Sequence, residues 1–257
     1  MNVQTLQTQM KTLKLKTASQ ELEEVLIKYK KAVTLDWTID LFQREIDSRA
    51  EKTIQARIKK ASFPELTSLE SFDWDFNSKI NRQKIESLAT LKFIEQNQIA
   101  LFLGAPGTGK THLALALGIK AAKEGYRVLC TSAKRLSQSI MTAKLKNNLD
   151  YLFKKILSAQ LWIIDDWGVV SMNREVAEEV FDLLDRRKQT SAMILTSNRD
   201  INEWGQVFPD PVIANATVDR IFDRAEIILF NGKSFRLKGK IKSPDFDKTK
   251  TPVYVTT

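Results

Sequence analysis

The sequence contains almost none of the residues that build disulfide frameworks, histidine-based sites or membrane spans. Its 257 residues include one cysteine, Cys130, and one histidine, His112. An intrachain disulfide is therefore impossible, which favours a reducing compartment, and sites built on several histidines are excluded. No apolar run approaches the roughly 18 residues of a membrane span, and the polar, basic N-terminus has no apolar signal core. We therefore expect a cytoplasmic protein without a membrane partner.

Negative charge is scarce relative to positive charge, since 40 Lys/Arg outnumber 31 Asp/Glu and give a net charge of +9. One internal stretch, 134–155, holds six cations and a single acid, Asp150. The six cations are Lys134, Arg135, Lys144, Lys146, Lys154 and Lys155. Clusters of this kind attract polyanions such as nucleic acid, whereas the simpler interpretation is a solvated helix face. Charge alone leaves both interpretations open.

The N-terminal part of the chain shows helical periodicity only. Apolar residues recur at helical spacing over 18–34 and over about 37–60, and Pro64 then ends the pattern. The stretch 62–77 is rich in aromatic residues and resembles a linker that packs onto the next domain. We therefore predict a small all-helical domain over residues 1–71.

Short apolar runs alternate with helical patterns over 72–240, which predicts an α/β fold with a mostly parallel sheet between helices. The runs are 99–103, 127–131, 161–164, 193–196 and 227–230. Asn231-Gly232 is a strong hairpin signal, so we expect 234–237 to return as the partner strand of the last run. Residues 241–257 have no pattern and are predicted to be a flexible basic tail.

A glycine-rich loop, Gly-Ala-Pro-Gly-Thr-Gly-Lys-Thr at 104–111, joins the first predicted strand to a helix. Glycines let backbone N–H groups approach phosphates closely, and the helix N-terminus adds a favourable dipole. Lys110 can reach the β- and γ-phosphates of ATP, and Thr111 can give its hydroxyl to Mg²⁺. We predict that the nucleotide lies against Gly104, Ala105, Pro106, Gly107, Thr108, Gly109, Lys110, Thr111 and His112.

Polar side chains follow two of the predicted strands. Asp165 and Asp166 come directly after the run 161–164, and Asn198 follows the run 193–196. Phosphoryl transfer relies on positioning and charge neutralisation. We therefore predict that Asp165 holds Mg²⁺ through a water molecule and that Asp166 polarises the attacking water. Asn198 is predicted to contact the γ-phosphate and the same water. The sequence thus predicts an ATPase.

Arg220, in Val-Asp-Arg-Ile, is a candidate arginine finger. A planar cation can stabilise charge on the transferred phosphoryl group, often from a neighbouring subunit. The alternative is an ion pair on a helix, because Asp219 and Asp223 are close in sequence. The residues alone leave both roles open.

Four segments together resemble IstB-type transposition helper ATPases, a branch of the AAA+ superfamily close to DnaC-type helicase loaders. The segments are GAPGTGKTHLALALG (104–118), LWIIDDWG (161–168), LTSN (195–198) and DPVIANATVDRIFDRAEIILFNGKSFRL (210–237). The glycine loop is shared by many ATPases, whereas the second and fourth segments are much narrower signals. The resemblance implies an AAA+ core, here without the C-terminal helical lid because the chain ends soon after Leu237.

The resemblance also implies a function. Such proteins bind ATP and Mg²⁺, assemble as homo-oligomers on double-stranded DNA with little sequence preference, and assist a partner transposase. The family's ATP and magnesium positions correspond to Lys110, Thr111, Asp165, Asp166 and Asn198. Its trans-acting arginine corresponds to Arg220, which favours the finger role. The stretch 134–155 becomes the leading DNA-contact candidate, and the N-terminal helices are a second candidate that also serves assembly.

Other interpretations remain open at this point. A DnaC-like helicase loader shares the ATPase core but prefers single-stranded DNA and binds a replicative helicase. A metabolic P-loop kinase would transfer phosphate to a small acceptor, although such enzymes usually carry an arginine-bearing lid. Asp166 stands where most AAA+ proteins have glutamate, so we expect slow hydrolysis, and ATP binding alone could act as the switch.

Overall fold

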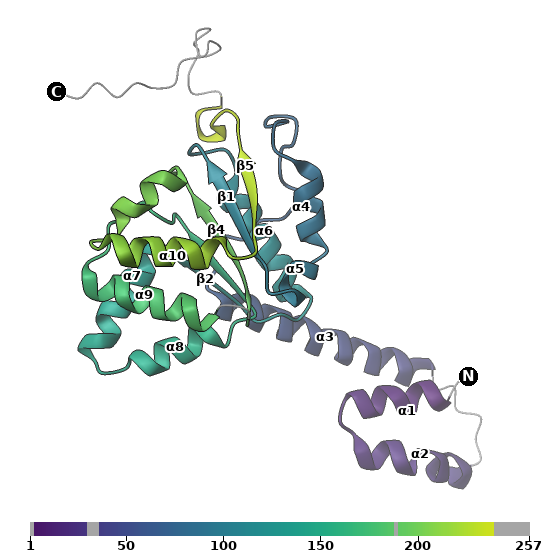
Figure 1. Cartoon of the computed structure of the whole chain (residues 1–257). Coiled ribbons are helices and arrows are strands. Elements are labelled where there is room, and N and C mark those ends of the chain that lie inside the picture. Colours follow the sequence, from purple (N-terminus) through teal and green to yellow (C-terminus); the bar gives the residue numbers. More distant parts are fainter. Residues whose placement is uncertain (1–2, 30–35, 188–189, 239–257) are drawn as a thin grey trace, which may run out of the picture. The chain divides into compact units, whose positions relative to one another are not determined.

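The structure, a computed structural model, describes residues 3–29, 36–187 and 190–238 (Figure 1). The chain forms two compact units, Met1–Ala61 and Ser62–Thr257. The aromatic linker over 62–77 belongs to the second unit, which therefore begins before residue 72. The expected tail at 241–257 lies outside the described residues. No helix within the described ranges is both long and apolar enough to cross a membrane.

Helices alone make up the first unit. They are α1 (Val3–Thr12), α2 (Lys16–Tyr29) and α3 (Asp36–Ala61). Leu6 and Met10 of α1 are buried, and apolar side chains of α2 and α3 pack on them, namely Leu22, Leu26, Ile39 and Phe42. The sequence pattern predicts α2 and α3 but not α1, because the glutamines and threonines of α1 dilute its apolar periodicity.

Parallel strands form the sheet of the second unit, in the order β2-β3-β4-β1-β5. They are β1 (Ile99–Gly104), β2 (Val128–Ser132), β3 (Leu161–Asp165), β4 (Ala192–Ser197) and β5 (Ala225–Phe230). Each predicted apolar run is confirmed as a strand. Because β1 pairs with β4 and β4 with β3, the carboxyl ends of these three strands meet at one edge of the sheet.

Two helical layers enclose the sheet. On one face, α6 (Lys110–Lys123) packs so closely that a Cβ on Gly118 would collide with the Ile163 side chain. On the other face, helices share one core with Leu101, Trp162 and Leu195 of the strands. They are α7 (Ala133–Leu145), α8 (Leu149–Leu157), α9 (Arg174–Arg187) and α10 (Pro211–Phe222). This arrangement is the predicted α/β fold.

Left-handed residues break two of the predicted helices. The helix expected over 79–96 is divided into α4 (Arg82–Ala89) and α5 (Lys92–Glu95) by Leu91, with φ 64°. The helical stretch 133–159 is divided into α7 and α8 around Asn147, with φ 49°. Asparagine visits this region at little cost, whereas the strain at Leu91 is offset by its burial in the core.

The predicted hairpin after β5 is wrong. Residues 234–237 form no strand, and Phe235–Leu237 are a 3-10 turn, η2. The backbone of Lys233 pairs instead with a side chain: its N–H donates to Asn77 Oδ1 (3.1 Å) and its carbonyl accepts from Asn77 Nδ2 (3.2 Å). Asn77 thus takes the hydrogen bonds that a partner strand would have received.

Candidate functional site

The glycine-rich loop lies between the end of β1 and the start of α6, as predicted. Gly104 has φ 149°, and a Cβ there would collide with the carbonyl of Phe230 on the neighbouring β5. Gly107 has φ 77°, and a Cβ would collide with the Ser234 side chain. Both positions therefore require glycine, and they let the loop fold back over the N-terminus of α6, where phosphate binds favourably.

Lys110 points into the loop that precedes it. Its ammonium donates to the carbonyl oxygens of Gly104 and Ala105, both at 2.7 Å. Lys110 is only 5% exposed. Burial lowers the pKa of Lys110 to about 8, although the charges of Asp166 and Asp165 act against this shift. Burial removes water from this ammonium, and the negative charge of a bound phosphate group would stabilise its charged form.

Asp165 ends β3 directly beside Thr111. Its Oδ1 accepts a hydrogen bond from Thr111 Oγ1 at 2.8 Å and another from Thr196 Oγ1 of β4. A threonine hydroxyl and one carboxylate in contact are what a P-loop offers to Mg²⁺, which takes its other ligands from water and phosphate. Among the described residues no group of three or more His, Cys, Asp or Glu forms a metal cage. The donor set therefore fits a magnesium ion that arrives with a nucleotide.

Asp166 has a left-handed backbone, with φ 55°. Its N–H donates to Thr196 Oγ1 (3.1 Å), and its Oδ1 faces Asn198 Nδ2 at 3.4 Å. Burial, and secondarily the charge of Asp165, raises the pKa of the Asp166 carboxyl. Asp166 and Asn198 thus lie side by side, as expected for two groups that contact the same water.

An open cleft of about 500 Å³ joins these side chains. Its lining includes Pro106, Gly107, Gly109, Lys110, Thr111, His112, Asp166 and Asn198 from the predicted site, and Glu65, Val169, Phe235 and Arg236 in addition. The structure therefore brings most predicted nucleotide-binding residues around one cavity. Their individual roles stay predictions.

Sequence reasoning missed Thr196 and Arg236. Thr196 lies within the quoted Leu-Thr-Ser-Asn segment, but only the parallel register places its hydroxyl between the two aspartates of β3. Arg236 was assigned to the hairpin strand that does not exist, so its place in the cleft was hidden. A cationic residue near the end of the last strand was the available signal.

His112, which lines the cleft, also contacts the aromatic linker, and the tryptophans beside the acid pair lie in the core. His112 Nε2 lies 3.1 Å from the Ser68 carbonyl and 3.2 Å from Ser71 Oγ, and its ring packs against Phe72. Trp162 and Trp167 are fully buried. The histidine thus fastens the aromatic linker to the first turn of α6.

Arg220 lies at the opposite end of the sheet from the cleft. It is at the end of α10, just before β5, where the Arg224 carbonyl accepts from the N–H of Ile99 at the start of β1. Its guanidinium pairs with Asp185 (2.6 Å) and Asp219 (3.0 Å). Because six residues of β1 span about 17 Å, Arg220 cannot reach the phosphate loop of its own subunit.

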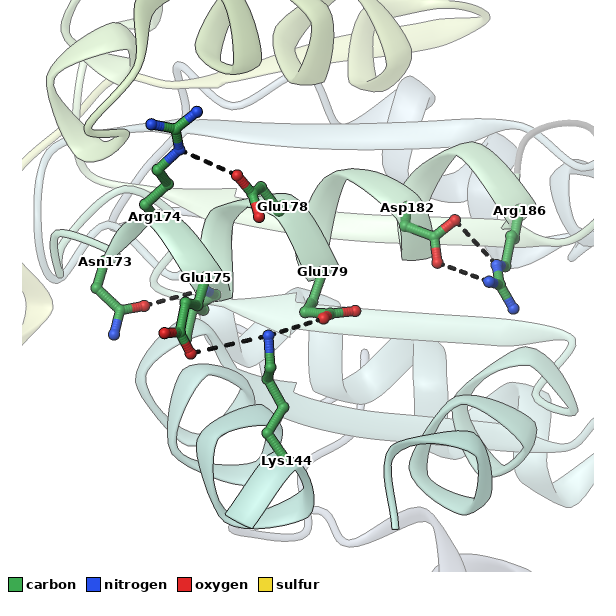
Figure 2. Close-up of polar contacts among 9 residues, drawn as sticks. Lys144, Asn173, Arg174, Glu175, Glu178, Glu179, Asp182 and Arg186 are labelled. Atoms are coloured by element: carbon green, nitrogen blue, oxygen red, sulfur yellow. Dashed lines mark hydrogen bonds and ion pairs between the residues drawn. The ribbon is translucent and has the colours of Figure 1, made fainter. Parts of the chain in front are cut away.

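The basic stretch 134–155 divides into paired and unpaired cations. Figure 2 shows Lys144 held between two acids of α9, Glu179 at 3.0 Å and Glu175 at 3.8 Å. Arg135, Lys146 and Lys155 instead line an open groove of about 360 Å³ between α7 and α8, together with the exposed Tyr151. Lys134 and Lys154 are exposed outside this groove.

Comparison with known sequences identifies one family, whose members are ATP-binding proteins of insertion sequences. The family model of IstB-like ATP binding proteins matches residues 8–243. A putative ATP-binding protein of insertion sequence IS21 from Pseudomonas aeruginosa is 39% identical over 211 residues, covering 82% of this chain and 80% of the relative. One of insertion sequence IS232 from Bacillus thuringiensis subsp. berliner is 35% identical over 237 residues, covering 91% and 95%.

Solved structures with the same fold include replication proteins. The AMPPCP-bound DnaA from Aquifex aeolicus superposes with a TM-score of 0.54 at 22% identity, covering 68% of this chain and 53% of that one. The DnaC helicase loader superposes with a TM-score of 0.51 at 20% identity, covering 58% and 87%. At these identities the likeness establishes a shared fold alone.

Proposed function

The chain belongs to the family of IstB-like ATP-binding proteins of insertion sequences, and on this premise we propose that it hydrolyses ATP, assembles on duplex DNA and assists a transposase. The observation that carries the proposal is that Lys110 and Thr111 line one open cleft and that Asp165 accepts a hydrogen bond from Thr111 there. The groove between α7 and α8 on the same unit, which is lined by cations, offers a surface for DNA binding.

The chemistry at the cleft follows from what each group can do. Lys110 neutralises phosphate charge. Thr111 and Asp165 would hold Mg²⁺, which would supply further positive charge beside the phosphates when bound. Asp166 and Asn198 orient a water molecule for in-line attack. Asp166 is one methylene shorter than the glutamate usual in AAA+ proteins, so hydrolysis is slow and the ATP-bound state persists.

DNA contact is assigned to the groove between α7 and α8. Arg135, Lys146 and Lys155 have open space before them, and phosphates of a duplex would release counterions on meeting them. Lys144 contributes less, because Glu175 and Glu179 already neutralise it. Lys134 and Lys154 add to the surrounding field. The relatives encoded by insertion sequences support a transposase as the protein partner.

Binding to random-sequence duplex and single-stranded DNA tests the proposal. Fluorescence anisotropy is measured with ATP, ADP or no nucleotide over a range of salt, and Lys110→Ala serves as the control for nucleotide dependence. We expect tight duplex binding that requires ATP, weakens with salt and fails in the control. A preference for single strands would favour a helicase loader, and binding indifferent to nucleotide would contradict the proposal.

A triple variant tests the groove itself. Replacing Arg135, Lys146 and Lys155 by alanine should lower the log–log salt slope by about 2.7, since each phosphate contact contributes about 0.9. The matched control replaces three exposed lysines elsewhere on the unit, Lys79, Lys92 and Lys123, and removes the same charge. Equal loss in both variants would show that net charge, not the groove, holds DNA.

A further inference from the structure

We propose that Arg236 binds the terminal phosphate of ATP within its own subunit, and that the segment 232–238 is built to hold it there. This inference rests on the proposed nucleotide site and adds a residue to it. The segment follows β5 directly, and its residues Phe235 and Arg236 line the cleft. It therefore supplies in cis a cation that no lid helix provides among the described residues.

Arg236 faces the reacting end of the cleft. It shares the lining with Lys110, Asp166 and Asn198, and its charge is close enough to lower the pKa of both Lys110 and Asp166. Its guanidinium forms no hydrogen bond or ion pair with any described residue. Two cations that face one open space repel each other until an anion enters between them. A phosphate with several oxygens satisfies both, and guanidinium matches it well.

Backbone contact fixes the segment to the phosphate loop. The Phe235 N–H donates to the Gly107 carbonyl at 2.8 Å. Ser234 occupies the space where Gly107 would carry a side chain. The residue before Arg236 is therefore bonded to the loop that wraps the phosphates, so Arg236 keeps its position relative to them.

Asn77 joins the same two segments from beneath. It is 4% exposed, and its amide donates to the carbonyls of Thr108 (3.1 Å) and Lys233 (3.2 Å) while accepting from the Lys233 N–H (3.1 Å). One buried side chain thus ties the phosphate loop to the start of the turn. A buried amide with three good partners is costly to disrupt, which makes this a fixed support.

Lys238 anchors the other end of the turn. Its ammonium pairs with Asp73 at 2.8 Å and lies over the rings of Phe76 and Phe235, 5.0 and 4.9 Å from their centres. Phe76 and Phe235 also stack edge to face, 5.2 Å apart. Arg236 is therefore held between two anchored neighbours, with its own side chain left free to meet a ligand.

Equilibrium binding of ATP and ADP, measured by calorimetry with Mg²⁺, tests the inference without relying on turnover. For Arg236→Ala we expect the affinity for ATP to fall about ten- to a hundredfold, the range of a charge-assisted hydrogen bond, while the affinity for ADP changes little. Arg236→Lys should recover part of the loss. Arg174→Ala is the matched control, because Arg174 is an exposed arginine paired only with Glu178 on α9.

A second variant tests the support. Asn77→Ala should lower the affinity for ATP, as Arg236→Ala does. In the double variant, the preference for ATP over ADP should be little lower than in Arg236→Ala alone. Unchanged ATP affinity in Arg236→Ala, or equal losses for ATP and ADP, would overturn the inference. Failure of the unmodified protein to bind ATP would instead refute the proposed function, so the two outcomes are distinguishable.

Discussion

At the carboxyl ends of β1, β3 and β4, Lys110 and Arg236 face an open cleft of about 500 Å³, whereas at the amino ends of β1 and β4 Arg187 and Arg220 line a space of only about 20 Å³. Both ends of the sheet carry cations near the same strands, and Arg224 also lines the space at the amino end. They differ in what those cations meet. One end offers room for a ligand, and the other is filled by the protein itself.

Arg187 illustrates the closed end. It is 1% exposed, lies over the ring of Trp162, and donates to the carbonyls of Ile156 (2.5 Å), Ala159 (3.1 Å) and Ala192 (3.4 Å). No carboxylate of the described residues pairs with it, and burial lowers its pKa to about 10. This buried cation has a structural role, which we call a fastener: its hydrogen bonds hold the end of α8 to the start of β4. Open space in front of a cation distinguishes a ligand-binding group from a fastener.

Arg220 gives the largest expected effect, because it is a fastener in its own subunit and a proposed finger for the next one. Arg220→Ala should lower ATP hydrolysis in the DNA-bound assembly about a thousandfold. Mixing it with Lys110→Ala, which is inactive for a different reason, should restore part of the activity. The intact phosphate loop of an Arg220→Ala subunit meets Arg220 wherever its neighbour is a Lys110→Ala subunit. Phosphate release is measured after co-assembly is verified by capture of a tagged subunit.

Arg186→Ala is the control for this mixture, since Arg186 is an exposed arginine that is also paired with an aspartate, Asp182 at 2.8 Å, but it lies on α9 and not on α10 (Figure 2). It should keep its activity in every mixture. Full activity of Arg220→Ala alone, or a co-assembled mixture that stays inactive, would show that Arg220 has only a structural role and is not an arginine finger.

Arg187→Met sharpens the comparison through stability. Three buried carbonyls would lose their donor, so we expect the free energy of unfolding to fall by about 3 kcal/mol. Urea unfolding followed by circular dichroism measures the change. Arg186→Met, the exposed neighbour on α9, should stay within about 0.5 kcal/mol of the unmodified protein. Equal stability of the two variants would mean that the carbonyl contacts contribute little.

The open end should respond to pH in two opposite ways. Because the pKa of Lys110 is lowered from 10.5 to about 8, the unfolded chain binds more protons between these values, and nucleotide-free stability should rise with pH there. ATP favours the charged lysine, so its binding takes up a proton above pH 8, and affinity should fall by up to about tenfold per pH unit. Calorimetry in buffers of different ionisation enthalpy measures the uptake. Lys110→Arg should abolish it, and persistence would assign it to another group.

The sheet and the core of the site could be predicted because their signals are local. Each strand is an apolar run of its own length, and the loop at 104–111 needs glycines at fixed positions. Asp165 and Asn198 end two such runs, and neighbouring parallel strands bring their ends together. The structure places the loop and Asn198 around one cleft, with Asp165 bonded to Thr111 of that loop, as the sequence indicates.

The remainder depends on contacts between distant residues. Asn231-Gly232 looks like a hairpin turn, yet Asn77, more than 150 positions earlier in the chain, takes the hydrogen bonds of Lys233. The same partnership brings Arg236 to the cleft, which no local pattern indicates. The pairing of Lys144 with α9 likewise follows from how two helices pack. Local propensity cannot anticipate such partners.

The hydroxyl of Thr196 has a mechanical consequence. It bonds both the side chain of Asp165 and the backbone of Asp166. The positions of the last residue of β3 and of the acid that follows it therefore depend on the position of β4. The amino end of that strand is gripped by Arg187 and by Gln98, whose carbonyl accepts from the N–H of Met193. A hydrogen-bonded strand is stiff along its axis, and close-packed interiors transmit strain. A small displacement of β4 along its axis, caused at its amino end, would therefore move Asp165 and Asp166 together.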